Sequence, residues 1–313
     1  MKIAFLLYPT SKVNAAEDSS FWMMLELVRR GHSVFYFESW HLVWSGGVPK
    51  ARLFPARLDR RKGFLPAALS REHSDLSHFD CIFIRKEPPF DNGYLHALQL
   101  LEKIKHRTFI LNDPAGIAMA NEKLFILRFP KYIPETFVTS DMDDAKKFVK
   151  SLGKRAVIKR LRDKGGAGIF STFPGDENLP SLVEAATDFG KEMVMLQRFI
   201  PARQFGDKRI MVLDGKILGG MVRRPPAHDF RANIGVGASF GRATFTAADR
   251  RLVEDIAPEL CRRGLHFVGI DLIGKYLTEI NVTSPAGIAD VILLEKRHPE
   301  RDVADFIEAR CGV

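Results

Sequence analysis

The residues best suited to chemistry lie in the last fifth of the chain, in a segment with the pattern of a β-hairpin. Glu279 and Asn281 are two positions apart on an expected strand, so their side chains point to the same face. Asp271 lies on the preceding strand, and an odd-numbered loop near Gly274 would place it opposite Glu279. Three oxygen ligands would then converge, which suits Mg²⁺, with Mn²⁺ as the alternative ion. A solvated hairpin face would give the same pattern, although the apolar flanks argue against an exposed edge.

Two lysines have spacings that suit a phosphate site. Lys159 ends an expected strand at 155–160, just before a loop that contains Gly165 and Gly166. Lysine supplies positive charge to phosphate, and glycines let backbone N–H groups approach it. Lys123 lies early in a helical pattern. Each lysine would look the same if it were only solvated, so the pattern favours a phosphate site without fixing one.

Arginines form a third pattern. Arg209 is followed fourteen residues later, across an expected hairpin, by Arg223-Arg224, and Arg231 lies in the next loop. Arginine binds carboxylates and phosphates through charge-assisted, often bidentate hydrogen bonds. A solvated basic face is the alternative interpretation.

Composition excludes several classes of protein. The three cysteines are far apart and no CxxC or Cys/His cluster occurs, which favours a reduced, cytoplasmic protein without a zinc site or disulfide framework. No apolar run reaches the ~18 residues of a membrane span. The net charge of +9 allows nucleic acid as a partner, but a pocket for a nucleotide and carboxylates explains the sign equally well. We therefore expect small-molecule substrates, no nucleic acid and no membrane.

The order of the elements indicates three kinds of structure. Strand patterns at 2–8, 33–38, 81–84 and 108–111 alternate with helices after 18–20 and at 93–106, which predicts an open parallel sheet. Ligands of such sheets gather at the carboxyl ends of the strands, here the loops 9–18 and 85–91.

Beyond these elements the pattern changes twice. Helices at 141–152 and 180–189 with strands at 155–160 and 193–196 form a small α+β module. A hairpin at 210–222, a helix at 247–263 and a second hairpin at 267–282 predict an antiparallel sheet. The fold class is therefore a combination of α/β and α+β.

Seven stretches, in order along nearly the whole chain, carry a family resemblance. They are DSSF at 18–21, RKEPPFD at 85–91, NEKLF at 121–125, PET at 134–136, GDKR at 206–209, FVGID at 267–271 and LTEINVTSP at 277–285. Together they resemble the bacterial glutathione synthetase family, and RKEPPFD is unusual outside it.

This resemblance implies the ATP-grasp fold, with an N-terminal parallel-sheet domain (1–121), a central lid domain (122–197) and a C-terminal antiparallel-sheet domain (198–313). The implied ATP-binding residues are Lys123, Lys159, Gly165, Gly166, Gln197, Arg198, Phe199, Ile200 and Asp207. The implied catalytic residues are Arg209, Arg224 and Arg231, and the implied Mg²⁺ ligands are Asp271, Glu279 and Asn281. The implied substrate-binding residues are Asp18, Ser19, Ser20, Arg85, Asn233 and Ser284.

The implied reaction joins γ-glutamylcysteine to glycine through an acyl phosphate, with release of ADP and phosphate. Neither a nucleophile signature nor GxxxxGK[ST], HExxH or GxGxxG occurs, and this reaction needs no protein nucleophile. The family also implies a homo-oligomer.

Two loops depart from the family pattern. Lys159 is followed by RLRDK before Gly165, and the stretch 225–241 keeps Arg231 and Asn233 but has Ala232 where a glycine is expected. These loops cover phosphate and substrate, so two alternatives stay open. One is an ATP-grasp peptide or glutamate ligase resembling the ribosomal-protein-modifying enzymes. The other is a nucleotide-binding protein that has lost catalysis.

Overall fold

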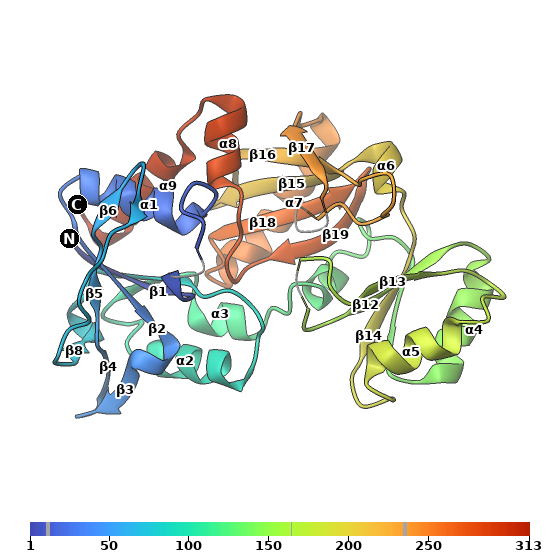
Figure 1. Cartoon of the computed structure of the whole chain (residues 1–313), viewed down its shortest axis with the longest axis horizontal. Coiled ribbons are helices and arrows are strands. Elements are labelled where there is room, and N and C mark those ends of the chain that lie inside the picture. Colours follow the sequence, from blue (N-terminus) through green and yellow to red (C-terminus); the bar gives the residue numbers. More distant parts are fainter. Residues whose placement is uncertain (11–12, 164, 234–236) are drawn as a thin grey trace.

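Three sheets of four or five strands follow one another along the long axis of the molecule (Figure 1). The structure is a computed structural model, and it describes residues 1–10, 13–163, 165–233 and 237–313. An N-terminal sheet lies at one end, a small sheet with two helices lies at the other, and an antiparallel sheet lies between them (Figure 1).

The N-terminal sheet has the strand order β10-β9-β1-β2-β5. Strands β10, β9, β1 and β2 pair in parallel, as the sequence predicted, whereas the edge strand β5 is antiparallel to β2. Every residue of β9 is buried, as expected for a parallel strand covered on both faces. The elements of this part are β1 (Lys2–Leu7), α1 (Ser19–Arg29), β2 (Ser33–Glu38), η2 (Ser39–His41), β3 (Leu42–Ser45), β4 (Val48–Ala51), β5 (Phe54–Pro55), β6 (Leu58–Asp59), β7 (Gly63–Phe64), β8 (Ser74–Asp75), η3 (Leu76–His78), β9 (Cys81–Arg85), α2 (Asn92–Glu102), β10 (Phe109–Leu111) and α3 (Pro114–Ala118).

Two details of this part differ from the sequence-based expectation. The helix expected at 93–106 ends at Glu102, and the short strands between residues 42 and 75 were not anticipated. These strands are two to four residues long, too short to show a periodic pattern. The expected start of α1 is confirmed, because the Asp18 carboxylate accepts a hydrogen bond from the Phe21 N–H at 2.6 Å.

The small sheet has the order β11-β14-β12-β13 and is antiparallel throughout. Helices α4 and α5 pack on it through a hydrophobic cluster of their own, which includes Val149, Ile158 and Val183. We call this unit the lid. Its elements are β11 (Thr136–Thr139), α4 (Met142–Leu152), β12 (Ala156–Arg160), β13 (Ile169–Thr172), α5 (Leu179–Thr187) and β14 (Val194–Arg198). The preceding η4 (Leu124–Arg128) packs on the antiparallel sheet in the middle of the molecule, and its Phe125 and Ile126 belong to the hydrophobic cluster of that sheet.

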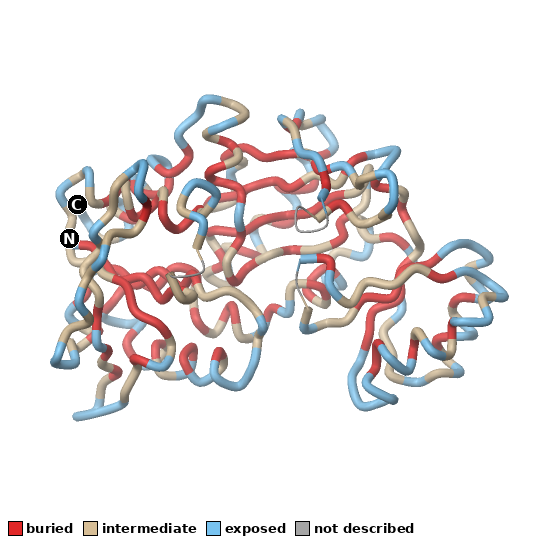
Figure 2. Tube along the Cα trace, in the orientation of Figure 1, coloured by how far each residue is buried: buried red, intermediate tan, exposed pale blue. Residues whose placement is uncertain are grey.

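The middle sheet has the order β17-β16-β15-β18-β19, and both predicted hairpins belong to it. One hydrophobic cluster joins it to the N-terminal sheet, with Ile82 from β9 and Ile270 from β18 as members. Buried residues concentrate in these two sheets (Figure 2). The elements of this part are α6 (Ala202–Phe205), β15 (Asp207–Leu213), β16 (Lys216–Arg224), β17 (Ser239–Arg242), α7 (Ala247–Arg262), β18 (Phe267–Ile273), β19 (Tyr276–Asn281), α8 (Ile288–Glu295) and α9 (Pro299–Cys311). The domain boundaries at 121/122 and 197/198 stay predictions.

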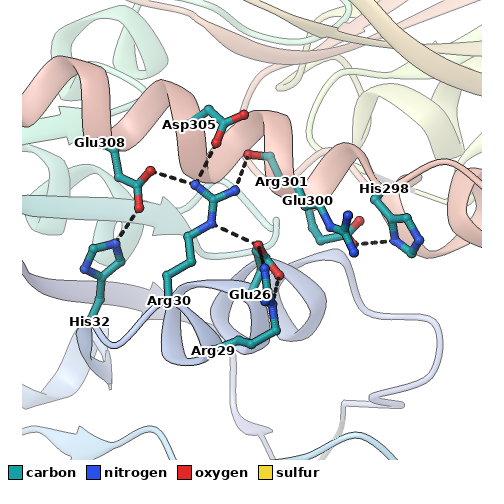
Figure 3. A network of polar contacts seen from close by, with 9 residues as sticks. All are labelled: Glu26, Arg29, Arg30, His32, His298, Glu300, Arg301, Asp305 and Glu308. Atoms are coloured by element: carbon teal, nitrogen blue, oxygen red, sulfur yellow. Dashed lines mark hydrogen bonds and ion pairs between the residues drawn. The ribbon is translucent and has the colours of Figure 1, made fainter. Parts of the chain in front are cut away.

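Helix α9, the last in the sequence, packs beside α1, the first. Arg30, just after α1, donates to Glu26 at 2.9 Å and reaches α9, where it bonds to Asp305 and Glu308, each at 2.6 Å (Figure 3). His32 Nε2 lies 2.8 Å from the same Glu308 (Figure 3). Helix α9 therefore packs on the N-terminal part of the molecule, although it follows the middle sheet in sequence. Among the described helices, none combines the length and apolar character needed to cross a membrane.

We expect Arg30→Ala to lower the free energy of unfolding by about 1–3 kcal/mol, because it removes the one cation that pairs with Glu26, Asp305 and Glu308 together, although Arg29 still pairs with Glu26 at 2.7 Å. Chemical denaturation measures the change. Asp305→Ala is the matched control, since its side chain is 65% exposed and exposed ion pairs contribute about 0.2–1 kcal/mol. Equal losses for the two variants would contradict the assignment of Arg30 as the centre of the network.

Candidate functional site

A cavity of about 880 Å³ lies between the lid and the middle sheet. Many of the residues singled out in the sequence line it. They are Lys123, Lys159, Gly165, Gly166, Gln197, Arg198, Phe199, Ile200, Asp207, Arg231, Asn233, Asp271 and Glu279. These residues come from distant parts of the chain, so the fold itself brings them together.

Lys159 lies near the end of β12, and its side chain crosses from the lid to the middle sheet. Its Nζ donates to Gln197 Oε1 at 2.7 Å and to the carbonyl oxygen of Thr278 at 3.4 Å. Burial lowers the pKa of Lys159 to about 8, and the positive charge of Lys123 adds to this effect. A bound phosphate is negatively charged and would stabilise the charged form of Lys159.

Lys123 lies at the start of η4 and contacts both walls of the cavity. Its Nζ is 2.5 Å from the carbonyl oxygen of Asp163, in the lid loop, and 3.4 Å from Glu279 Oε1. The lysine and the carboxylate therefore meet at one end of the cavity, which is where a phosphate and its counter-ion would meet.

The hairpin of β18 and β19 has the register that the sequence analysis required. Asp271 is paired with Glu279, and Gly269 is paired with Asn281. A bulge next to Asp271 shifts the register, since the following residue Leu272 pairs with Leu277. The loop itself has two residues and not the expected odd number, since Ile273 pairs with Tyr276, and the extra residue Thr278 at the bulge keeps the two carboxylates opposite each other. The Asn281 amide donates to Asp271 Oδ2 at 3.2 Å, so the three predicted metal ligands are neighbours.

Two arginines and two aspartates form an alternating buried array at this hairpin. Arg209 binds Asp271 through two parallel hydrogen bonds of 2.5 and 2.8 Å. Arg223 Nη2 lies 3.2 Å from Oδ2 of the same carboxylate and 2.9 Å from Asp207 Oδ2. Burial raises the pKa of Asp207, whereas the two guanidinium groups hold the pKa of Asp271 low against the effect of burial.

Of the predicted catalytic residues, Arg231 lines the cavity and Arg209 binds the cavity-lining Asp271, whereas Arg224 does neither. Arg224 is exposed, and its Nη1 donates to the carbonyl oxygen of Arg203 at 3.4 Å. Its neighbour Arg223 lines the cavity instead, because adjacent residues of a strand point to opposite faces. The catalytic role expected for Arg224 stays a prediction, and the position of Arg223 on the cavity wall favours Arg223 for that role. Counting by alternation across the Asp214-Gly215 turn would have found Arg223, which is paired with Asp207.

The loop after β16 reaches the lid loop. The Arg231 guanidinium is held by Asp229, and its Nη1 donates to the carbonyl oxygen of Gly166 at 3.0 Å. Gly166 has φ +82°, and a Cβ there would lie 2.3 Å from Asn233 Oδ1, so glycine is required. Both departing loops therefore contact each other over the cavity. Lys164 of the first loop and residues 234–236 of the second lie outside the described residues.

The remaining predicted substrate residues form a second group, at the start of α1 and the end of β9. Arg85 Nε donates to Ser20 Oγ at 3.0 Å, and Ser284 Oγ donates to the Arg85 carbonyl oxygen at 3.2 Å. Ser19 Oγ accepts from two backbone N–H groups after residue 286, each at 3.1 Å. Asp18 caps α1, and burial raises its pKa. None of these residues lines the 880 Å³ cavity.

One short segment connects the second group to the metal-ligand hairpin. Arg85 Nη2 donates to the carbonyl oxygen of Pro285 at 2.9 Å, and Arg209 Nη1 donates to that of Ala286 at 3.1 Å. Burial lowers the pKa of Arg85 to about 10. Its Nη1 is buried and has no hydrogen-bond partner within the described ranges, so it is suited to receive an anionic group.

Comparison with protein families gives two matches that together cover most of the chain. Residues 1–118 match the N-terminal domain of prokaryotic glutathione synthetase, and residues 122–296 match its ATP-grasp domain.

Whole-chain relatives carry the same name. The glutathione synthetase of Mesorhizobium japonicum is 37% identical over 291 residues, 93% of each chain. That of Gloeobacter violaceus is 38% identical over an alignment of 322 positions, and the alignment covers 98% of this chain and 96% of the relative. These relatives do not favour a ligase of other specificity.

Solved structures of distant sequence share the fold. D-cycloserine synthetase DcsG matches with a TM-score of 0.70 at 13% identity, covering 98% of this chain and 99% of that one. An ATP-grasp RimK domain protein from Sphaerobacter thermophilus matches with a TM-score of 0.63 at 17% identity, covering 98% and 99%. At this identity they confirm the ATP-grasp fold predicted from the sequence, and nothing further.

The lowered pKa of Lys159 predicts how nucleotide binding depends on pH. Below a pH of about 8 the side chain is charged and attracts phosphate, and above it the neutral form predominates. We expect the dissociation constant of a non-hydrolysable ATP analogue to rise up to about tenfold per pH unit above 8. Calorimetric titration between pH 6.5 and 9.5 measures it. Lys159→Met should bind weakly with little pH dependence, whereas Lys131→Met, at an exposed lysine, should follow the wild type. A wild-type affinity that is constant up to pH 9.5 would refute the role of Lys159.

The orientation of β16 predicts opposite results for two adjacent arginines. Arg223→Lys keeps the charge but loses the guanidinium nitrogen Nη2 that contacts both Asp207 and Asp271, so kcat/KM should fall at least about tenfold. Arg224→Lys, at an exposed position, should stay within about twofold of the wild type. Steady-state ATP turnover of the two variants decides the matter, and the reverse order would show that Arg224 faces the site.

Proposed function

Because the chain belongs to the prokaryotic glutathione synthetase family, we propose that the cavity between the lid and the middle sheet is where this ATP-grasp ligase binds ATP and forms a C–N bond. The product of that bond is glutathione, and the substrates are small molecules. The observation that carries the assignment is the convergence of Lys123, Lys159 and Glu279 on one cavity.

The reaction proceeds through an acyl phosphate. An oxygen of the cysteinyl carboxylate of γ-glutamylcysteine attacks the γ-phosphorus of ATP, and ADP leaves. The glycine amine then attacks the acyl carbon and loses a proton, while phosphate leaves with the C–O bonding electrons. Neither step needs a protein nucleophile, so the chain's contribution is positioning, charge and exclusion of water.

The ATP site is supported by the chemistry of the residues along the cavity. Lys123 and Lys159 supply positive charge at the end where the phosphates would lie. Asp207 lies at the wall of the same cavity, and its Oδ1 is buried without a hydrogen-bond donor among the described residues. A ribose hydroxyl would satisfy that oxygen. Backbone groups around Gln197–Ile200 lie where the adenine would bind.

Enzymes of this family use ATP together with a divalent metal, and we assign that metal to Mg²⁺ held by Asp271, Glu279 and Asn281. The donor set is made of hard oxygen atoms, which fits Mg²⁺. Asp271 and Glu279 both line the cavity, and Glu279 has Lys123 as its charged neighbour. Bound there, the ion would neutralise phosphate charge. Oδ2 of Asp271 already contacts Arg209, Arg223 and Asn281, whereas Oδ1 accepts from Arg209 Nε alone among the described residues and keeps a lone pair for a cation.

The peptide substrate is assigned to the second group of residues. The unpartnered Nη1 of Arg85 suits a substrate carboxylate, and Ser20 and Ser284 surround the same guanidinium group. Segment 284–286 joins this group to Arg209, which supports transfer of phosphate between the two regions. Arg231 and Asn233 lie on the loop over the cavity, where they would help to exclude water. A cytoplasmic homo-oligomer remains our expectation for the assembled enzyme.

The substrate test measures ADP release by the purified protein with ATP and Mg²⁺. We expect γ-glutamylcysteine plus glycine to stimulate release, and each alone to give little. Glu279→Gln should lower the stimulated rate at least about a hundredfold, because it removes one of the two cavity-facing carboxylate charges of the metal site. If the pair gave no stimulation while the protein still bound ATP, the assigned substrates would be wrong. If Glu279→Gln had wild-type turnover, the metal assignment would be wrong.

A further inference from the structure

Glu122 is a partly buried carboxylate that the proposed chemistry does not use. Its Oε1 accepts three hydrogen bonds, from the Val282 N–H at 2.9 Å, the Thr283 N–H at 3.0 Å and the Thr283 hydroxyl at 2.8 Å. Its backbone carbonyl oxygen accepts from the Ile280 N–H at 3.0 Å. These contacts fix the backbone on both sides of Asn281.

The same short segment also carries Lys123. Lys123 Nζ lies 3.4 Å from Glu279 Oε1, so residues 122–123 contact β19 and the residues that follow it at several successive positions. Strand β19 is the edge strand of its sheet, with β18 as its only strand neighbour in the described part of the chain. Glu122 and Lys123 therefore supply the support that a second neighbouring strand would otherwise give.

We propose that Glu122 is a positioning residue that holds the metal ligands Glu279 and Asn281 in register with the phosphate-binding Lys123. It acts through the backbone of residues 280–283 and touches neither substrate nor metal. The inference rests on the proposed assignment of Glu279 and Asn281 as metal ligands. Supporting residues of this kind change metal affinity or activity by about 10–100-fold when they are replaced.

Two substitutions separate positioning by the hydrogen bonds of Glu122 from an effect of its negative charge. Glutamine keeps an acceptor oxygen at the Oε1 position and loses the charge, whereas alanine loses both. Glu279 lies near enough to raise the pKa of Glu122, beyond the larger effect of burial, so the charge of Glu122 also acts on the metal site. If positioning dominates, Glu122→Gln will resemble the wild type and Glu122→Ala will not.

The experiment measures ATP turnover with γ-glutamylcysteine and glycine at saturating ATP, as a function of Mg²⁺ concentration. We expect Glu122→Ala to raise the half-saturating Mg²⁺ concentration at least about tenfold and to lower kcat. Glu122→Gln should stay within about threefold of the wild type. Thr283→Val removes one of the three donors and should give a smaller shift in the same direction, so the test holds even if Glu122→Ala does not fold.

Glu295→Ala is the matched control. This carboxylate is 5% exposed and accepts from the Gly220 N–H at 3.3 Å, away from the metal ligands. It should cost stability without changing the Mg²⁺ dependence.

The Glu122 and Glu279 variants together separate a failure of the Glu122 proposal from a failure of the metal-site assignment. Wild-type Mg²⁺ dependence in Glu122→Ala and Thr283→Val, together with collapse of Glu279→Gln, would overturn the role of Glu122 and leave the metal site intact. Wild-type turnover of Glu279→Gln would overturn the metal site itself. Loss of Mg²⁺ affinity in Glu122→Gln equal to that in Glu122→Ala would show that the charge, and not the hydrogen bonds, is what matters.

Discussion

The buried array Arg209–Asp271–Arg223–Asp207 is the constraint on which the site depends. Charges removed from water are stable only when each meets an opposite charge at hydrogen-bonding distance, and here each aspartate meets at least one arginine. The four residues come from β15, β16 and β18, so their pairing also fixes the register of the middle sheet. Asp271 is also one of the proposed metal ligands, so the charges that stabilise the middle sheet are shared with the proposed site.

Much of this architecture was accessible from the sequence, for physical reasons that differ between elements. The strands at 2–7 and 81–85 were visible because each is a run of apolar residues, and α4 was visible because Asp141 and Gly153 mark its ends. Side-chain alternation predicted that Glu279 and Asn281 share a face, whereas the pairing of Asp271 with Glu279 depended on an odd-numbered loop and is supplied by the bulge. The ATP-grasp arrangement came from the family resemblance, since no local pattern states how three sheets are placed.

Other features depend on tertiary contacts that a local pattern does not contain. Arg223 and Arg224 are adjacent residues of the same type, and only the register of β16 against β15 decides which one is buried. Glu122 looked like an ordinary polar residue at the start of a helix, because its three partners lie 160 or 161 residues away. The short strands between residues 42 and 75 are set by packing of a long connection and by no periodicity of their own.

The contact between α1 and α9 also bears on how the chain is made. The two helices are joined by an ion pair between residues 275 positions apart, and both chain ends lie on the same side of the molecule (Figure 1). During synthesis α1 and its neighbouring strands leave the ribosome long before α9, so Arg30 and His32 lack their partners Asp305 and Glu308 until α9 has emerged. The N-terminal part is translated first, but its contacts with α9 form last.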